Sequence, residues 1–182
     1  MRRHTFTFWL VLAGLISTPF ISPYSSAETL FQGHSQAYQP ALTRFPPPDI
    51  NFLDAQNQAH TLADYPGQVL VINFWASWCP SCLHEMASLQ RLQDVAGARV
   101  KVITLNQDLT DSTQIQQLLH RVQAGQLPSL RDPDGRLGYA LGQTLLPTTF
   151  FIDSNGQVAG QLIGAAEWDS SEALALIQSL HL

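Results

Sequence analysis

Lysine is almost absent from this chain, because Lys101 is the only one among 182 residues. Charged residues make up 13% of the sequence, and the formal net charge is −5. A protein that binds nucleic acid needs clustered lysine and arginine to contact phosphates. The composition therefore argues against a nucleic-acid partner, whereas the hydrophobic content of 45% is ordinary for a globular domain.

Cysteine is equally scarce, with only Cys79 and Cys82, separated by Pro80 and Ser81. A structural disulfide stabilises most when it closes a long loop, and this pair would close a very short one. A structural zinc site takes four ligands, and the neighbouring histidine, His84, would point elsewhere on a helix, so we expect no metal. The spacing favours redox chemistry, in which the two cysteines cycle between dithiol and disulfide without a cofactor.

The longest apolar stretch, residues 6–21, is short for a membrane span, which needs about 20 residues. Arg2 and Arg3 precede the stretch, and small residues at 25–27 follow it, as in a secretory signal peptide. We therefore predict that residues 1–27 direct export and are then removed. An uncleaved N-terminal anchor is the alternative, and no cysteine follows the stretch to carry a lipid.

Residues 28–48 are polar, lack a clear period and end in three prolines, so we expect an extended lead-in. The domain is predicted over residues 49–182, beginning with an extra β-hairpin within residues 50–62. Further strands are predicted over 69–75, 100–106, 148–152 and 157–163, and helices over 80–96, from Asp111, over 136–141 and from Asp169. This order predicts an α/β fold with a central mixed sheet and helices on both faces, an arrangement that resembles the thioredoxin-like fold.

Cys79 is expected at the start of the helix over 80–96, directly after a buried strand. The first turn of a helix presents unpaired N–H groups and the positive end of the helix dipole, which favour a thiolate over a thiol. Pro80 suits the first helical position, because its missing donor costs nothing there. Cys79 is therefore predicted to attack substrate disulfides, and Cys82, one turn deeper, to resolve the mixed disulfide.

The stretch from Val69 to Cys82 resembles the active-site segment of the thioredoxin superfamily. Residues 83–86 and 146–153 are similar to those of its exported TlpA/ResA branch, and the likeness extends from Pro48 to the C-terminus. The resemblance implies a thiol–disulfide oxidoreductase whose substrate loop surrounds a cis-proline.

The resemblance assigns roles near Pro147. It implies that the Leu146–Pro147 peptide bond is cis and that the backbone of Leu146 binds the substrate chain as an added strand beside the cysteines. Trp78, directly before Cys79, is expected to shield the thiolate and to contact substrate together with Pro80. An ordinary loop proline is the alternative interpretation of Pro147.

Glu85 lies three residues after Cys82, where this branch commonly has an acid. It could move protons during resolution if burial raised its pKa; a solvated glutamate on the helix surface is the alternative. Asn73 replaces the buried aspartate of thioredoxins and cannot exchange a proton. Thr148 follows Pro147 in the substrate loop and is expected to bind substrate with it. It replaces the glutamate usual in reductases of the CcmG type, and this argues against that subgroup.

These features predict an exported, periplasmic or otherwise extracytoplasmic protein-disulfide reductase, with cytochrome c maturation as one setting. Its expected partners are proteins with cysteine pairs and a membrane thiol-transfer reductase of the DsbD/CcdA type, which would keep it reduced. No repeat or long apolar seam indicates assembly, so we expect a monomer.

Three alternative functions share this fold. A disulfide-introducing oxidant is one, although strong oxidants usually carry a histidine between the cysteines. A copper-delivery module is the second, with His120 and His181 as candidate ligands by elimination. A peroxiredoxin is disfavoured, because Ala76 replaces the threonine that such enzymes place before their reactive cysteine.

Overall fold

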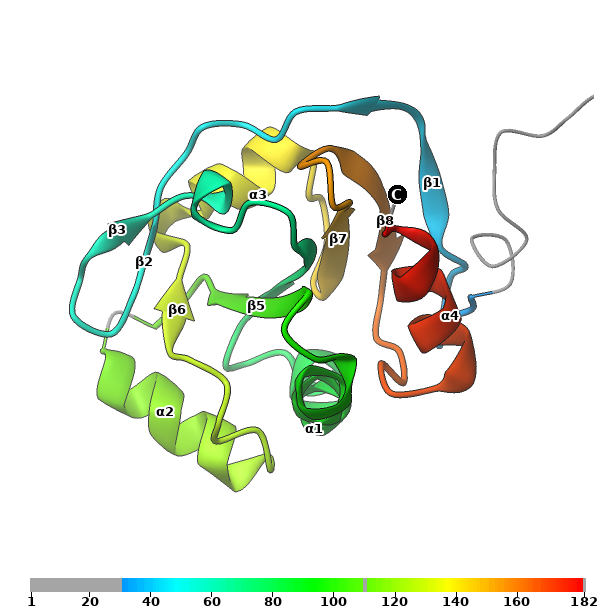
Figure 1. The fold of residues 1–182 in the computed structure, drawn as a ribbon. Helices are drawn as coiled ribbons and strands as arrows, with labels where there is room; N and C mark the ends of the chain where they lie inside the picture. Colours follow the sequence, from blue (N-terminus) through cyan, green and yellow to red (C-terminus); the bar gives the residue numbers. More distant parts are fainter. Residues whose placement is uncertain (1–30, 110, 182) are drawn as a thin grey trace, which may run out of the picture.

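The computed structural model describes residues 31–109 and 111–181, which build a mixed β-sheet with helices on both faces (Figure 1). In the described residues the strands follow the order β1-β8-β7-β4-β5-β6-β2-β3 across the sheet. The strands are β1 (Gln39–Phe45), β2 (Phe52–Leu53), β3 (Ala59–His60), β4 (Val69–Trp75), β5 (Val100–Asn106), β6 (Leu130–Arg131), β7 (Thr148–Ile152) and β8 (Val158–Ile163). The helices are α1 (Pro80–Ala96), α2 (Ser112–Arg121), α3 (Arg136–Leu141) and α4 (Ser171–Ser179). The predicted thioredoxin-like α/β fold is thereby confirmed.

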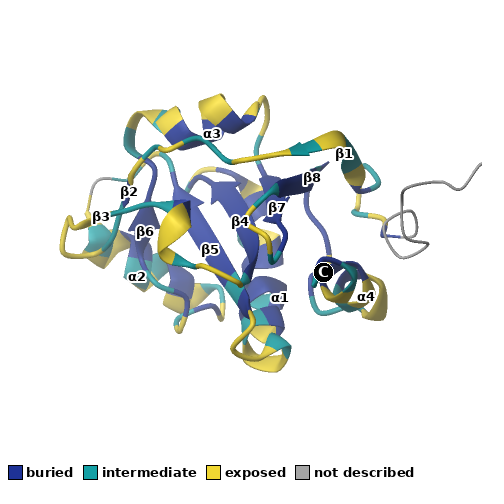
Figure 2. Ribbon diagram, turned by 45° about the horizontal axis from the view of Figure 1, so that its top comes forward, coloured by how far each residue is buried: buried dark blue, intermediate teal, exposed yellow. Residues whose placement is uncertain are grey.

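The central strand β4 is buried on both faces of the sheet. It pairs in parallel with β5 and antiparallel with β7. Successive side chains of a strand point to opposite faces, so Val69 and Val71 join the core under α1, α2 and α4, whereas Leu70 and Ile72 join the core that α3 covers. A nearly unbroken apolar run is the sequence pattern of such a strand, and Figure 2 shows the buried sheet between the helices.

Most elements lie where the sequence predicts them, and β4, β5, β7, α1 and α3 have the predicted bounds. The extra hairpin forms as β2 and β3, which pair antiparallel at one edge of the sheet. The last helix begins at Ser171, two residues after the predicted start at Asp169. The Asp169 carboxylate accepts a hydrogen bond from Arg91 of α1 at 2.6 Å. The Ser170 side chain caps this helix instead.

Residues 31–48 belong to the folded domain, which differs from the extended lead-in expected over residues 28–48. β1 pairs antiparallel with β8 at the second edge of the sheet. Tyr38 packs edge-to-face on Phe151 with ring centroids 5.3 Å apart, and its hydroxyl donates to the Ala159 carbonyl at 2.9 Å. This strand could not be predicted from its sequence, because an edge strand can keep polar side chains in water and need not show an apolar pattern. The predicted signal peptide, residues 1–27, lies outside the described residues.

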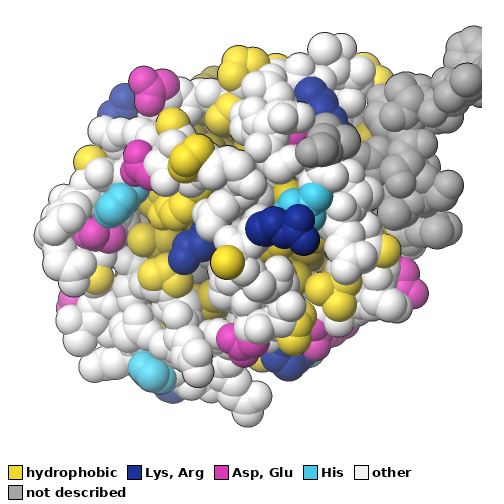
Figure 3. Space-filling view, viewed as in Figure 1, with side chains coloured by type: hydrophobic (Ala, Val, Ile, Leu, Met, Phe, Trp, Pro, Cys, Tyr) yellow, Lys and Arg dark blue, Asp and Glu magenta, His cyan; other side chains and the backbone are white. Residues whose placement is uncertain are grey.

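The surface and the helices add two observations. On the face shown in Figure 3, the lysine and arginine side chains are scattered among acidic, apolar and uncharged ones, so this face carries no basic patch. Within the described part of the chain, no helix is long and apolar enough to cross a bilayer.

We expect Gly160→Ala to destabilise the protein, because Gly160 of β8 lets β1 and Tyr38 approach closely. A Cβ atom there would lie 2.4 Å from the Tyr38 hydroxyl oxygen and 2.5 Å from the Gln39 carbonyl oxygen. Overpacking of this kind costs about 1–3 kcal/mol, measurable by urea unfolding. Gln161→Ala on the same strand is the matched control and should change stability by only about 0.5 kcal/mol. Equal stability of both variants would contradict the packing of β1 described above.

Candidate active site

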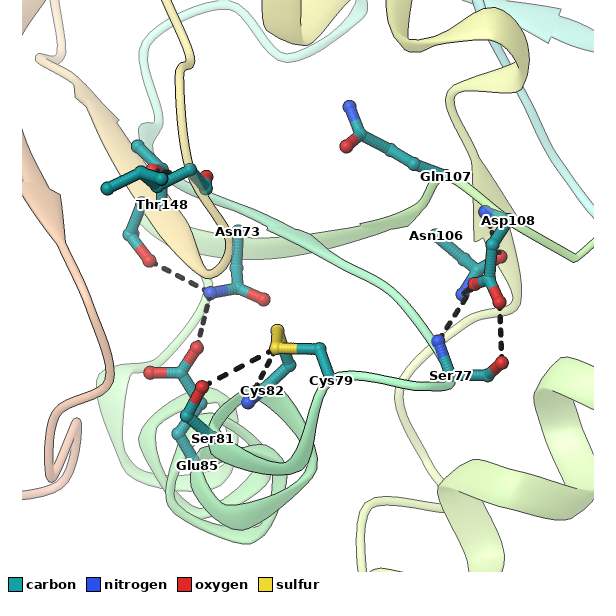
Figure 4. The surroundings of a disulfide bond; sticks show 12 residues. Asn73, Ser77, Cys79, Ser81, Cys82, Glu85, Asn106, Gln107, Asp108 and Thr148 are labelled. Carbon is teal, nitrogen blue, oxygen red and sulfur yellow. Dashed lines mark hydrogen bonds between the residues drawn. A yellow bond between two sulfur atoms is a disulfide. The ribbon is translucent and has the colours of Figure 1, made fainter.

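Cys79 and Cys82 form a disulfide between the end of β4 and the start of α1 (Figure 4). Cys79 is the N-cap residue of α1, and its sulfur accepts a hydrogen bond from the Cys82 N–H at 3.2 Å. Pro80 takes the first helical position, where no N–H is needed. The helix therefore directs one N–H group of its first turn at the Cys79 sulfur, an arrangement that stabilises a thiolate.

The two cysteines differ in their access to solvent. Cys79 keeps 4% of its surface exposed, and Cys82 keeps none. The neighbouring Trp78 is 69% exposed, whereas Trp75 is fully buried in the core. The Ser81 hydroxyl lies 3.5 Å from the Cys79 sulfur. An incoming disulfide can therefore approach Cys79 more easily than Cys82.

The predicted cis-proline loop lies beside the cysteine pair. The Leu146–Pro147 bond is cis, and the Pro147 carbonyl accepts a hydrogen bond from the Gly164 N–H at 2.8 Å. Leu146 lines two hollows of the surface, one shared with Trp78 and the other with Ser81. The loop therefore borders the Cys79–Cys82 segment, where a bound chain could reach the disulfide.

Thr148, the residue after this proline, is fully buried. Its hydroxyl donates to the Leu145 carbonyl at 2.9 Å. This hydrogen bond holds the loop in shape and leaves the hydroxyl committed to the backbone. The structure thus gives Thr148 a positioning role in the loop.

The loop before Cys79 is held by a carboxylate that the sequence analysis missed. Asp108 accepts hydrogen bonds from the Ser77 N–H at 2.8 Å and the Ser77 hydroxyl at 2.5 Å. Asn106, the last residue of β5, donates to the same Asp108 at 2.9 Å, as Figure 4 shows. The end of β5 therefore fixes the approach to the disulfide. No local pattern marks Asp108 as a partner of Ser77, because the two lie in separate elements.

Glu85 is fully buried, so the alternative of a solvated surface glutamate is wrong. One carboxylate oxygen accepts from the Asn73 side-chain amide at 2.8 Å; the other accepts from the Trp168 indole N–H at 2.8 Å and the Ala166 N–H at 3.1 Å. Burial is the largest influence on this carboxyl and raises the pKa of Glu85 to about 7, although the hydrogen bonds act in the opposite direction. Glu85 can therefore gain and lose a proton near neutral pH.

Asn73 connects Glu85 to β7. Its amide nitrogen donates both to Glu85 and to the Thr149 hydroxyl, the latter at 2.9 Å. Its amide oxygen is buried and has no hydrogen-bond partner in the described structure. Asn73 cannot titrate in place of the aspartate of thioredoxins, but it orients the carboxyl group that can.

The candidate copper ligands do not join this site. His120 lies on α2 and His181 follows α4, and neither lines the hollows beside the disulfide. Over residues 31–109 and 111–181, no three histidine, cysteine or acidic side chains gather so that they could hold a metal ion.

A disulfide at a helix N-terminus beside a cis-proline, carried by this sheet, defines a redox-active protein of the thioredoxin-like class. Comparison with known families agrees with this class. The Redoxin family matches residues 42–177, and the chain belongs to it.

Individual relatives carry related names. The chain is 36% identical over 121 residues to the thiol:disulfide interchange protein DsbE of Allochromatium vinosum. This match covers 65% of this chain and 65% of that relative. It is also 30% identical over 118 residues to the thiol-disulfide oxidoreductase ResA of Geobacillus thermodenitrificans. This match covers 64% of this chain and 67% of that relative. The match therefore spans about two thirds of the length of these relatives. The predicted resemblance to the TlpA/ResA branch is confirmed.

A solved structure is also similar. The exposed lipoprotein thioredoxin Etrx1 of Streptococcus pneumoniae aligns with a TM-score of 0.59 and 27% identity, covering 73% of this chain and 98% of that one. The fold around the disulfide is thus shared with a thioredoxin of known structure.

Proposed function

We propose that this protein is a thiol–disulfide oxidoreductase that reduces disulfide bonds of exported proteins. The observation that carries the proposal is the Cys79–Cys82 disulfide at the N-terminus of α1, with Cys79 the more open cysteine and the cis-proline loop beside it. The names of the DsbE and ResA relatives support the same chemistry.

The proposed cycle begins with both cysteines reduced. The Cys79 thiolate attacks one sulfur of a substrate disulfide, whose S–S bond breaks as the other sulfur leaves and takes up a proton. Cys82 then loses its proton and attacks the Cys79 sulfur of the mixed disulfide. The second substrate thiol leaves, and two electrons have passed from the cysteine pair to the substrate. The end point is the disulfide form that the structure shows.

Glu85 is the proposed proton carrier for the second step. It follows Cys82 by three positions on α1, and such residues share one face of a helix. A carboxyl with a pKa of about 7 is well suited to exchange protons at neutral pH. Glu85 accepts the Cys82 proton in this proposal, and Asn73 and Trp168 position its two oxygens.

Substrate binding in the proposal uses the segments on both sides of the disulfide. The Leu146 backbone pairs with the substrate chain as an added strand, Pro147 and Thr148 hold the loop, and Trp78 and Pro80 contact the substrate near its cysteine. The proteins reduced are those with cysteine pairs, including those of cytochrome c maturation.

The proposal also requires a partner that reduces the Cys79–Cys82 disulfide again after each cycle. A reductant in an oxidising compartment must itself be reduced again. We assign this step to a membrane thiol-transfer reductase of the DsbD/CcdA type, acting on an extracytoplasmic monomer.

The direction of the reaction can be tested through the reduction potential. Equilibration against glutathione or dithiothreitol buffers should give a value nearer that of thioredoxin, about −270 mV, than that of DsbA, about −120 mV. The reason is that Pro80 and Ser81 lie between the cysteines and supply no positive charge, so the helix N-terminus alone favours the thiolate. A potential near −120 mV would instead assign disulfide formation.

A further inference from the structure

Exposed apolar side chains gather at one groove beside the disulfide. Large apolar side chains are exposed at six positions of the described chain: Leu42, Phe45, Trp78, Val95, Tyr139 and Leu145. Three of them, Trp78, Tyr139 and Leu145, line a single groove of about 490 Å³. Isolated exposed apolar residues are ordinary, whereas a shared cluster of them marks a binding surface.

Two of the polar side chains that line this groove are hydrogen-bonded within the protein. Gln107 and Gln143 donate to each other's side-chain oxygens at 2.8 and 3.0 Å, and Gln107 also donates to Asp132 at 3.1 Å. Gly138 makes room for this amide pair, because a Cβ atom there would lie 1.9 Å from the Gln143 side-chain oxygen. No charged side chain lines the groove. It therefore offers apolar contact and no oppositely charged side chain for a charged ligand.

The groove is continuous with the site proposed above. Trp78 directly precedes Cys79, Leu146 directly precedes Pro147, and both residues line the groove. From there the groove runs to Tyr139 on α3, which is 83% exposed. A polypeptide paired with Leu146, with its cysteine at Cys79, would therefore place a neighbouring side chain between Trp78 and Tyr139.

We propose that this groove binds an uncharged, large apolar side chain next to the reacting cysteine of the substrate polypeptide, and that Tyr139 determines this specificity. The inference rests on the proposed reductase function and adds a substrate class to it. Burying a large apolar side chain fully is worth about 1.5–3 kcal/mol, and about 1.4 kcal/mol is a tenfold difference in affinity. Substrates with such a residue should therefore react about tenfold faster at low concentration.

The test uses single turnovers of the fully reduced protein with disulfide-linked dimers of two short peptides. The peptides differ only in having phenylalanine or serine on both sides of the cysteine. We expect a ratio of second-order rate constants of about ten in favour of phenylalanine, since tenfold corresponds to about 1.4 kcal/mol. Tyr139→Ser should lower the ratio severalfold. Val95→Ser, which removes another exposed apolar side chain, on α1 and outside the groove, should leave it at the wild-type value.

Three contrary results are distinguishable. Reduction of both peptides at equal rates would overturn the groove specificity and leave the reductase function standing. A preference for phenylalanine that survives in Tyr139→Ser would overturn the assignment to this groove. Failure of the reduced wild-type protein to reduce either peptide would overturn the proposed function, and the inference with it.

Discussion

Cys79→Ser will lower disulfide reduction to the uncatalysed rate, whereas Cys82→Ser will stop after the first step and accumulate a mixed disulfide with substrate. A serine hydroxyl is not ionised at neutral pH and cannot form a disulfide, so the variant at Cys79 lacks the nucleophile. The variant at Cys82 keeps the more open thiol at the helix N-terminus but lacks the thiol that releases the substrate. Non-reducing gels and mass spectrometry of protein mixed with a disulfide substrate will detect the adduct.

The double variant Cys79→Ser/Cys82→Ser is the control and should form no adduct. The two assignments are reversed if Cys79→Ser traps substrate and Cys82→Ser does not. That outcome would mean that the small difference in exposure between the cysteines does not decide which sulfur is attacked. It would leave the redox pair itself intact, with Cys82 as the attacking and Cys79 as the resolving cysteine.

The cysteine site was predictable because its determinants are adjacent in the sequence. A buried strand, two cysteines with a proline between them and a helical period follow one another within residues 69–96. Each of these signals is local, so their order already places Cys79 at a helix N-terminus. The prediction that the Leu146–Pro147 bond is cis had a different basis, because it was made from the family resemblance and not from any local pattern.

The surroundings of Glu85 could not be predicted from the sequence. Its partners Ala166 and Trp168 lie 81 and 83 positions away along the chain, and no periodicity links positions so distant. The helical spacing after Cys82 was compatible with both a buried and a solvated carboxyl. Only the packing of the segment between β8 and α4 against α1 decided between them, and that packing is a tertiary property.

β1 shows a different limit. None of its residues is fully buried, and its side chains show no apolar alternation. The strand is recognisable only through β8, which lies more than a hundred positions later and supplies its hydrogen bonds. The groove between Trp78 and Tyr139 has the same origin, because it exists only once α3 lies beside the cis-proline loop. Contacts between distant parts of the chain thus created both features, and no local sequence pattern marks either.

The free energy of unfolding of the oxidised wild-type protein will fall as the pH rises from about 4.5 to about 7, and Glu85→Gln will remove this fall. The folded protein holds the Glu85 proton up to a pKa of about 7, whereas the unfolded chain releases it near the ordinary value of 4.5. Between these values the folded state binds more protons, so the free energy of unfolding falls with rising pH. At about 1.36 kcal/mol per pKa unit, the fall amounts to about 3 kcal/mol.

Glutamine fits the site because Asn73 can adapt to it. The glutamine oxygen can accept from Ala166 and Trp168 as the carboxylate does, but its NH₂ group would then meet the amide nitrogen of Asn73. A half-turn of the Asn73 amide resolves this conflict, because the asparagine oxygen, which has no partner beside a carboxylate, can then accept from glutamine. The Thr149 hydroxyl, which accepts from the Asn73 amide nitrogen in the wild type, can donate to the same oxygen. The variant should therefore fold, and its stability should carry no titration from position 85.

Urea unfolding of both proteins across about pH 4 to 8 tests this prediction, since subtracting the two curves cancels the groups they share. Glu172→Gln on α4 is the matched control, because the pKa of that exposed carboxyl is lowered by its hydrogen bonds and cannot produce a fall above about pH 5. A constant difference between wild type and Glu85→Gln would mean that the buried carboxyl titrates normally.

The same substitution separates proton transfer from stability. The rate at which Cys82 resolves a mixed disulfide should show an inflection near pH 7 in the wild type. If Glu85 carries the proton, that inflection disappears in the glutamine variant, whereas a residue that only packed α1 against β7 would leave the pH profile unchanged.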